Sequence, residues 1–229
     1  MYRHVIKRLL DIILSGIAII LSAIPMLAIA IAIKIDDPGP VLFKQKRIGV
    51  NKNGEITYFM MWKFRSMKMS TPRDVPTHLL KNPEQYITRV GKFIRKASLD
   101  ELPQIYQVFT GKLSYIGPRP GLWNQTDLWE EREKYGANDI IPGITGWAQV
   151  NGRDELDIPV KARFDGEYAA ALNAGKCKGF AMDVKCFFRT IKTVLRAEGI
   201  IEGNVEAQEQ AEVSAEAHSE EHQKDVVSK

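Results

Sequence analysis

The chain has 229 residues, 45% hydrophobic and 26% charged, which is enough apolar material to bury the core of one domain. Its net charge of +4 is unevenly placed. The eight acidic residues and two lysines from Glu202 onward remove −6 from that total and leave +10 on residues 1–201. A basic body suits anionic partners such as phosphates, nucleotides or acidic lipids, whereas no motif or basic run supports nucleic-acid binding. Cys177 and Cys186 are too few to indicate a disulfide framework or a metal site, so we expect reduced core thiols in a cytosolic domain.

The first element is a hydrophobic segment that is long enough to cross a bilayer as one helix. Ile12 to Ile33 contains 22 residues without a charge. A signal peptide fits poorly, because the run is too long and lacks a small-residue cleavage site before the polar sequence. The same length and hydrophobicity disfavour the buried helix of a soluble protein.

Charge and a proline indicate how this segment meets the membrane. Basic residues lie on both sides of it: Arg3, His4, Lys7 and Arg8 precede it, and Lys34, Lys44, Lys46 and Arg47 follow it. Positive residues stay on the cytoplasmic side, so neither end is favoured for export. Pro25 removes a helix hydrogen bond and can bend the helix. A re-entrant hairpin with both ends in the cytoplasm satisfies both observations and is favoured slightly over an ordinary kinked span.

The sequence after this anchor predicts a small β element followed by helices. Asp37–Pro40 is a turn, Val41–Phe43 and Ile56–Met61 are expected strands, Asn51–Gly54 is a hairpin tip, and Ser70–Pro83 is a polar, mobile loop. Helical spacing follows at Tyr86–Lys96, again after Asp100, and at Asp183–Ala197.

The helix expected at Asp183–Ala197 is amphipathic. Its apolar face contains Val184, Phe187, Phe188, Ile191 and Leu195, and a second face contains Lys185, Arg189, Lys192 and Arg196. Such a helix can lie on an anionic membrane or pack its apolar face against the core, and both alternatives stay open. From Glu202 the chain is acidic and poor in large apolar side chains, so we expect a disordered tail.

Two adjacent carboxylates stand out in Ser98-Leu99-Asp100-Glu101-Leu102-Pro103. The structural interpretation is a helix start, with Ser98 and Glu101 as a capping box or Asp100 as the cap. The functional interpretation is phosphoryl chemistry at a helix start, where a carboxylate can act as nucleophile and its neighbour can hold Mg²⁺. By itself, such a pair favours the structural role.

Cations near these carboxylates change that balance. Arg95 lies just upstream, Lys63 and Arg65 flank Phe64, and Arg119 sits inside the rigid turn Gly117-Pro118-Arg119-Pro120. An arginine held in a fixed frame can contact phosphate oxygens through two nitrogens. Each cation alone fits a solvated surface, but four of them around a carboxylate pair favour a phosphate-binding site.

Residues 142–153, with the sequence PGITGWAQVNGR, form a stretch dense in turn residues that ends at Arg153. Its glycines permit close approach of the backbone to a ligand, and a buried turn ending in a short strand is the alternative.

Taken in order, KFRSM (63–67), SLDELPQ (98–104), GPRP (117–120) and PGITGWAQVNGR (142–153), after a basic hydrophobic N-terminus, resemble the bacterial sugar transferases. These are monotopic polyprenyl-phosphate phosphoglycosyl transferases, which start capsule, exopolysaccharide and glycan assembly. The resemblance covers about residues 1 to 200 and implies transfer of a sugar 1-phosphate from a UDP-sugar to undecaprenyl phosphate, with release of UMP. It also implies Mg²⁺ and a covalent aspartyl intermediate.

The resemblance assigns roles to individual positions. Asp100 is expected to be the nucleophile, with Glu101 as its partner in a metal-binding dyad. Lys63, Arg95 and Arg119 match positions near the phosphates, and Arg153 is a weaker candidate for the nucleotide. The family's re-entrant helix breaks at a Ser-Pro pair, whereas here Ile24 precedes Pro25, so the break is expected to persist with a different depth and angle.

These observations together predict an α+β protein. We expect a re-entrant membrane helix at residues 1–35, a mainly helical cytoplasmic catalytic domain at 36–201 with membrane-surface amphipathic helices, and an acidic tail at 202–229. The expected location is the bacterial inner membrane, where downstream glycosyltransferases are possible partners. The chain resembles the small, catalytic-domain-only form of the family. A glycosyltransferase that releases UDP and a non-catalytic membrane scaffold are the alternatives.

Overall fold

The computed structural model describes residues 2–51, 54–71, 83–152 and 156–196. It is a mixed helix and strand fold that is mostly helical, as expected. The elements, in chain order, are η1 (Tyr2–Ile6), α1 (Lys7–Asp36), β1 (Leu42–Ile48), β2 (Tyr58–Phe64), η3 (Pro83–Tyr86), α2 (Arg89–Lys96), η4 (Leu99–Glu101), α3 (Gln104–Phe109), β3 (Ser114–Ile116), α4 (Thr126–Glu133), η5 (Ala137–Asp139), β4 (Gly143–Thr145), η6 (Gln149–Asn151), α5 (Ile158–Asn173) and α6 (Lys176–Arg196).

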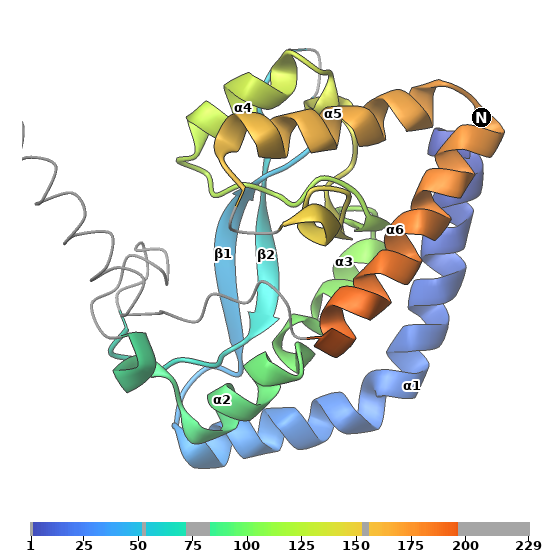
Figure 1. Cartoon of the computed structure of the whole chain (residues 1–229). Coiled ribbons are helices and arrows are strands. Elements are labelled where there is room, and N and C mark those ends of the chain that lie inside the picture. The colour runs from blue at the N-terminus through green and yellow to red at the C-terminus, as the bar shows by residue number, and fades with distance from the viewer. Residues whose placement is uncertain (1, 52–53, 72–82, 153–155, 197–229) are drawn as a thin grey trace, which may run out of the picture.

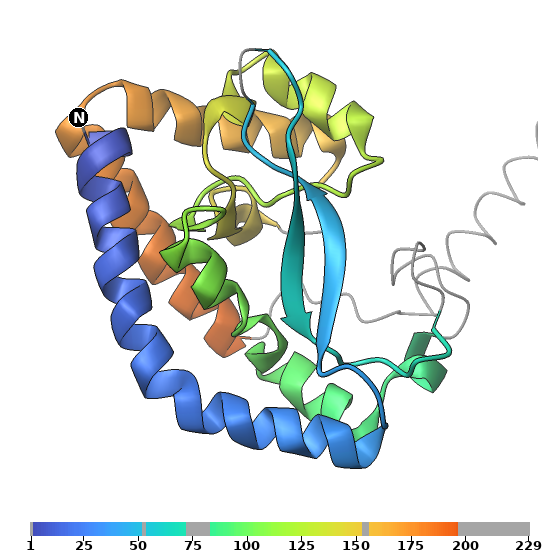
Figure 2. The same ribbon diagram turned by 180° about the vertical axis from the view of Figure 1, so that it is seen from behind.

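The N-terminal helix α1 is continuous but strongly bent (Figures 1 and 2). Pro25 lies inside it, and the helix bends, as expected, without being interrupted (Figure 1). A proline inside a helix removes one backbone hydrogen bond, and a bend is the expected consequence. One turn earlier, the Ser22 hydroxyl donates to the Ala18 carbonyl at 2.6 Å.

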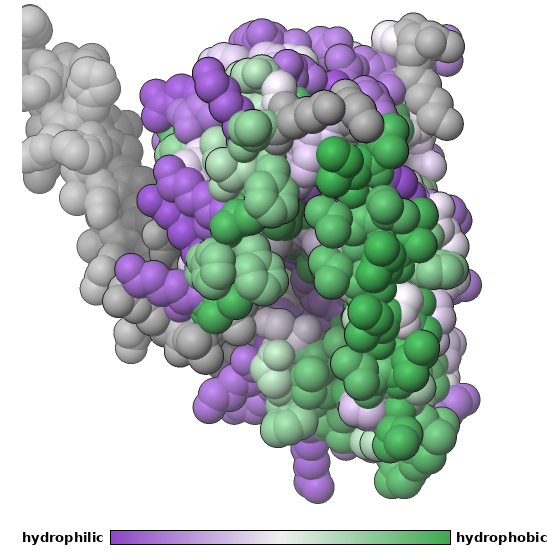
Figure 3. All heavy atoms as spheres, turned by 90° about the vertical axis from the view of Figure 1, so that its right-hand side faces the viewer, coloured by the Kyte–Doolittle hydropathy of each residue, from purple (hydrophilic) through white to green (hydrophobic). Residues whose placement is uncertain are grey.

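The outer surface of α1 is apolar and exposed. In the part of the chain that the structure describes, this is the one helix long and apolar enough to cross a membrane, and only 11% of its most apolar window is buried. Ile20, Ile24 and Ile35 are each more than three quarters exposed. The helix of a soluble core would be mostly buried, so α1 does not fit that alternative. Apolar side chains gather over this face of the molecule (Figure 3).

A polar stripe on α1 faces the rest of the protein. Lys7, Asp11 and Ser15, spaced four residues apart on one side of the helix, are all buried. Asp11 accepts hydrogen bonds from the Ser114 hydroxyl at 2.8 Å and from the Tyr115 backbone N–H at 3.2 Å. The first half of α1 is therefore attached to β3 through buried polar contacts.

Both ends of α1 contact the same globular body. At the start, the Lys7 ammonium lies 2.9 Å from Asp183 on α6, and Tyr2 donates to the same carboxylate at 2.6 Å. At the end, Asp36 accepts the backbone N–H of Val90 on α2 at 2.8 Å, and Asp37 pairs with Arg65. A single helix thus leaves the body and returns to it.

Two small sheets complete the framework. Strands β1 and β2 form an antiparallel hairpin whose register runs from Leu42 opposite Phe64 to Ile48 opposite Tyr58. Both strands are longer than predicted. Strands β3 and β4 pair in parallel, with Ser114 opposite Gly143. In residues 142–153 the strand therefore comes first and the turn follows, so the alternative of a turn that ends in a strand has the reverse order.

Two apolar clusters form the core. One joins η1 to α5 and α6 around Tyr168, and the other joins the second half of α1 to α2 around Ile94. Leu99 and Leu102 pack against the second cluster. This matters for the site, because the two residues between them are the predicted carboxylates.

The helix predicted at Asp183–Ala197 begins earlier, at Lys176. Its apolar residues Val184, Phe187, Phe188 and Ile191 are all exposed, so they do not pack against the core. Contact of this face with a membrane remains a prediction. The side chain of Leu195, residues 72–82 of the predicted loop and the tail from Glu202 lie outside the described residues.

Candidate active site

Asp100 and Glu101 lie in the short 3-10 turn η4, between α2 and α3. Ser98, which precedes the turn, has a φ of 54° and makes no capping hydrogen bond, so the predicted capping box is wrong. Asp100 is not the cap either, because α3 begins at Gln104 with Pro103 at the cap position. The turn exists because Leu99 and Leu102 anchor it on the apolar cluster, and the two carboxylates between them face the neighbouring cations.

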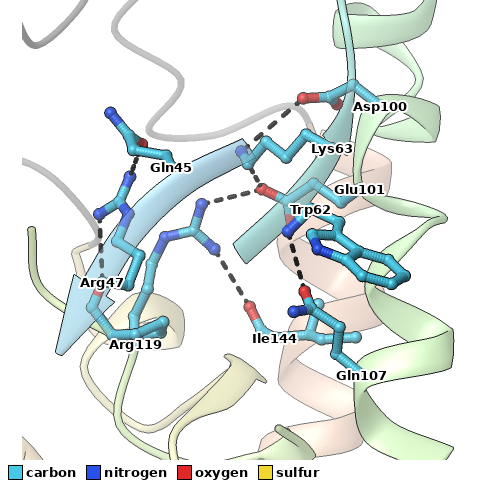
Figure 4. Close-up of polar contacts among 10 residues, drawn as sticks. Gln45, Arg47, Trp62, Lys63, Asp100, Glu101, Gln107, Arg119 and Ile144 are labelled. Carbon is cyan, nitrogen blue, oxygen red and sulfur yellow. Dashed lines mark hydrogen bonds and ion pairs between the residues drawn. The ribbon is translucent and has the colours of Figure 1, made fainter. Parts of the chain in front are cut away.

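Two predicted cations meet at Glu101. The Lys63 ammonium on β2 lies 2.7 Å from Glu101 Oε1, and Arg119 NH2 lies 2.8 Å from the same oxygen. Lys63 is also 3.7 Å from Asp100 Oδ2, which is beyond hydrogen-bond range. Figure 4 shows the two cations approaching the carboxylates from different elements. Residues that lie 38 positions before and 18 positions after Glu101 in the sequence therefore meet at one site, as predicted.

The two carboxylates have different electrostatic environments. Burial raises the pKa of Asp100 above its ordinary value, because the favourable charge of Lys63 only partly opposes it and Glu101 adds a like charge. Burial acts on Glu101 in the same direction, but Arg119 and Lys63 outweigh it and lower its pKa. Glu101 is thus a fixed anion held by two cations. Asp100 has no such short ion pair with Lys63 or Arg119, and its oxygens are therefore better placed to act as a nucleophile.

A buried glutamine fixes the strand that carries Lys63. The side-chain amide of Gln107 on α3 donates to the Met60 carbonyl at 2.6 Å, and its oxygen accepts the Trp62 backbone N–H at 2.9 Å. These bonds dock β2 on α3, the helix that follows the turn of the two carboxylates. Because neighbouring residues of a strand point to opposite faces, fixing Trp62 also fixes the direction of Lys63.

Glycines of two motifs let the backbones of residues 117 and 143–146 cross at close range. A Cβ on Gly117 would lie 2.4 Å from the Ile141 carbonyl oxygen, and a Cβ on Gly146 would lie 2.1 Å from the carbonyl oxygen of Gly117. Only glycine allows such an approach. The crossing places the Ile144 carbonyl within 3.2 Å of Arg119 NH1, so the second motif orients the arginine of the first.

The other three predicted cations differ in how close they lie to the carboxylate pair. Arg65 is buried and pairs with Asp37 at 2.6 Å, just after α1 ends, so the structure does not bring it to the carboxylate pair. Arg95, in the last turn of α2, is close enough to lower the pKa of Asp100, although burial has the larger and opposite effect. Arg153 lies outside the described residues.

Two residues of β1 join the site without having been predicted there. Arg47 donates to the Pro120 carbonyl at 3.1 Å and to Gln45 Oε1 at 2.7 Å, and lies beside Arg119 in Figure 4. Gln45 and Arg47 share one face of the hairpin with Lys63, since residues opposite Phe43, Gln45 and Arg47 are Lys63, Met61 and Phe59. Only the register of the hairpin reveals this, because in the sequence Arg47 reads as a flank of the membrane segment.

The turn at residues 146–152 packs against α6. The Trp147 indole donates to Glu167 at 2.8 Å, and Lys185 and Arg189 both lie 4.7 Å from the centre of its ring. Arg189 also donates to the Asn151 side chain at 2.5 Å. Part of the basic face of α6 thus holds this turn in place and is not simply solvated.

The dyad fits Mg²⁺ only with help from a substrate. The described residues contain no group of three or more His, Cys, Asp or Glu side chains that could hold a metal ion. Mg²⁺ commonly binds one or two carboxylates together with water and substrate phosphates. Since Lys63 and Arg119 occupy Glu101 Oε1, the second oxygen of Glu101 and the carboxylate of Asp100 are the candidate ligands.

Comparison with known proteins places these motifs in a wider group. Residues 2–197 match the family described as bacterial sugar transferase. The chain is 37% identical over 195 residues, 82% of its own length and 40% of the relative, to UDP-glucose:undecaprenyl-phosphate glucose-1-phosphate transferase of Escherichia coli (strain K12). It is 38% identical over 201 residues, 85% of its length and 44% of the relative, to UDP-N-acetylgalactosamine-undecaprenyl-phosphate N-acetylgalactosaminephosphotransferase of Aeromonas hydrophila.

Another relative has a length similar to that of this chain. An uncharacterized sugar transferase of Bacillus subtilis (strain 168) is 34% identical over 196 residues, which cover 86% of this chain and 90% of the relative. The chain spans about two fifths of the length of the relatives from Escherichia coli and Aeromonas hydrophila.

Proposed function

Because the chain belongs to the bacterial sugar transferase family, we propose that it moves a sugar 1-phosphate from a UDP-sugar to undecaprenyl phosphate and releases UMP. The reaction would start the assembly of a polysaccharide or glycan. The names of the relatives support the acceptor and the transferred group. The observation that carries the proposal is the carboxylate pair, in which Glu101 is neutralised by Lys63 and Arg119 while Asp100 is left available for chemistry.

The transfer proceeds in two displacements. A carboxylate oxygen of Asp100 attacks the β-phosphorus of the UDP-sugar, the bond from that phosphorus to the bridging oxygen breaks, and UMP leaves with the electron pair. A phosphate oxygen of undecaprenyl phosphate then attacks the same phosphorus and releases the Asp100 carboxylate. The partial burial of Asp100 supports this role, because a desolvated carboxylate is the stronger nucleophile.

The neighbouring side chains stabilise charge. Arg119 offers a planar fork beside the dyad and Lys63 a point charge, and both suit the oxygens of a transferring phosphoryl group. Arg95 adds positive charge near Asp100. When bound between the dyad and the donor, Mg²⁺ would neutralise charge on the pyrophosphate. The second oxygen of Glu101 and the carboxylate of Asp100 would hold that ion.

The membrane arrangement follows from α1. Its two ends contact one body and its outer face is apolar, which supports a re-entrant insertion with the catalytic domain on the cytoplasmic side of the inner membrane. The exposed apolar face of α6 would rest on the same membrane surface, where the lipid acceptor resides.

A donor screen tests the proposal. Full-length protein in lipid is given undecaprenyl phosphate, Mg²⁺ and, in turn, UDP-glucose or UDP-N-acetylgalactosamine, the donors that the relatives' names carry. We expect UMP release that depends on the acceptor with one of these donors. Release of UDP would identify a glycosyltransferase, and release of neither nucleotide with any UDP-sugar would indicate a non-catalytic role.

A further inference from the structure

Two arginines from distant elements hold consecutive backbone carbonyls of the turn that presents Arg119. Arg132 NH2 on α4 donates to the Arg119 carbonyl at 2.9 Å, and Arg47 NH1 on β1 donates to the Pro120 carbonyl at 3.1 Å. Because the side chain of Arg119 contacts Glu101, the direction of that side chain depends on a backbone fixed at two successive points.

Arg132 is itself held by a buried carboxylate. Its Nε and NH2 lie 2.8 and 2.6 Å from Oδ2 of Asp165 on α5, a carboxylate side chain with no exposed surface. The other oxygen, Oδ1, is buried without a hydrogen-bond partner among the described residues. Removing two charges from water is costly, and a pair that leaves one oxygen unsatisfied recovers that cost poorly. Stability alone is therefore a weak reason for this pair.

The pair is rigidly framed. Next to Asp165, a Cβ on Gly166 would lie 2.5 Å from Tyr135 Cβ, so α5 touches the segment after α4 more closely than a larger residue would permit. Asp165 thus fixes the guanidinium of Arg132 from one side, and the guanidinium also donates to the Arg119 carbonyl.

We propose that Arg132 and Asp165 are positioning residues, which orient Arg119 for the transferred phosphate by holding the Arg119 carbonyl. The proposal rests on the proposed function, since Arg119 is the group through which the pair acts. Lysine at position 132 keeps the charge but cannot contact Asp165 and the carbonyl with a planar fork. If the proposal holds, the loss of activity in Arg132→Lys arises because Arg119 is no longer held in the right direction.

A double-mutant cycle tests this dependence through UMP release by the full-length protein. Arg132→Lys is expected to lower kcat/KM for the UDP-sugar by about tenfold in the wild-type background, but by less than about twofold when Arg119→Lys is already present. A merely structural residue would cause the same loss in both backgrounds, and that result would overturn the proposal. Lys134→Gln, which breaks an exposed pair with Glu131 at the end of α4, is the matched control and should leave kcat/KM unchanged in both backgrounds.

A second variant separates positioning from folding. Replacing the pair with apolar residues, Arg132→Met together with Asp165→Leu, should keep the thermal midpoint yet lose activity as Arg132→Lys does. Normal turnover in this variant would overturn the proposal, as would unfolding of both variants, since the pair would then be only a structural requirement. A wild type that releases no UMP contradicts the proposed function instead.

Discussion

At the scale of the residue, Arg119 makes two contacts that a lysine cannot make together. Its NH2 reaches Glu101 at 2.8 Å while its NH1 reaches the Ile144 carbonyl at 3.2 Å. Arg119→Lys keeps the charge but loses this planar fork, so we expect turnover to fall by about tenfold or more. The side chain is more than a third exposed, and the thermal midpoint should change little. Near-normal turnover with unchanged stability would remove Arg119 from the site.

The two cysteines should react very differently. Cys186 is buried, and desolvation followed by the charge of Asp183 raises its pKa to about 12, whereas Cys177 is exposed, so the prediction that both are core thiols is wrong for Cys177. The thiolate is the reactive form, and at pH 8 about one Cys186 in ten thousand would carry it. Alkylation at pH 8 followed by mass spectrometry should modify Cys177 and spare Cys186. Equal labelling of both would contradict the packing of α6.

The sequence predicts the charged centre of the site better than its surroundings. The structure brings together four predicted residues, Lys63, Asp100, Glu101 and Arg119. Each lies in a motif whose residue types alone indicate phosphate chemistry. Arg65 does not join them, because β2 ends at Phe64 and the side chain of Arg65 pairs with Asp37 beyond the end of the strand. Arg47 is missed because its place depends on the register of the hairpin.

At the scale of the element, a buried carboxylate of α6 holds the start of α1 and the residues just before it. Asp183 accepts from Lys7 at 2.9 Å and from the hydroxyls of Tyr2 and Tyr168 at 2.6 Å each. Lys7→Met leaves that carboxylate without its cation, and we expect a loss of about 3 kcal/mol of unfolding free energy. Thermal unfolding in detergent should show a midpoint lowered by about 6–12 °C. Lys34→Met, at an exposed position of the same helix, is the control, and equal midpoints for the two variants would contradict this account.

Element bounds show where local signals compete with tertiary structure. The capping box fails because Leu99 and Leu102 draw the dyad turn onto the apolar cluster, which overrides the local preference of Ser98. The turn residues at the tip predict the hairpin. Its strands extend further than predicted, because the sequence of one strand alone does not show how far it pairs with the other. The helix α6 starts earlier than expected, at Lys176, where the apolar period is weaker.

At the scale of the whole molecule, the length of α1 and the contacts at its ends have to be reconciled. Thirty residues would extend about 45 Å if straight, enough to cross a bilayer. Yet its first turn pairs with α6 and its last residue accepts from α2, so both ends lie on one body. We therefore predict that the N-terminus and the catalytic domain share the cytoplasmic side.

Labelling in intact cells checks this topology. His4 is exposed, so His4→Cys in a background with Cys177→Ser and Cys186→Ser gives a single reactive thiol near the N-terminus. It should resist an impermeant thiol reagent until the cells are permeabilised, as should the control Lys134→Cys just after α4. Labelling of His4→Cys alone from outside would indicate a span and contradict the re-entrant arrangement.

The covalent step is the central claim, and Asp100 is the residue that tests it. Asp100→Asn keeps the size of the side chain, and the closest contact of Lys63 is with Glu101, so the fold should hold. An amide cannot form the acyl phosphate. The measurement is the label retained on the protein after incubation with a UDP-sugar, labelled in the sugar, and Mg²⁺ in the absence of lipid acceptor.

Wild type and Asp127→Asn, a change at an exposed carboxylate of α4, should retain the labelled sugar phosphate. Asp100→Asn should retain none and should show no steady release of UMP when the acceptor is added. An Asp100→Asn protein that turned over at a rate near wild type would contradict the covalent mechanism and leave direct transfer between donor and acceptor.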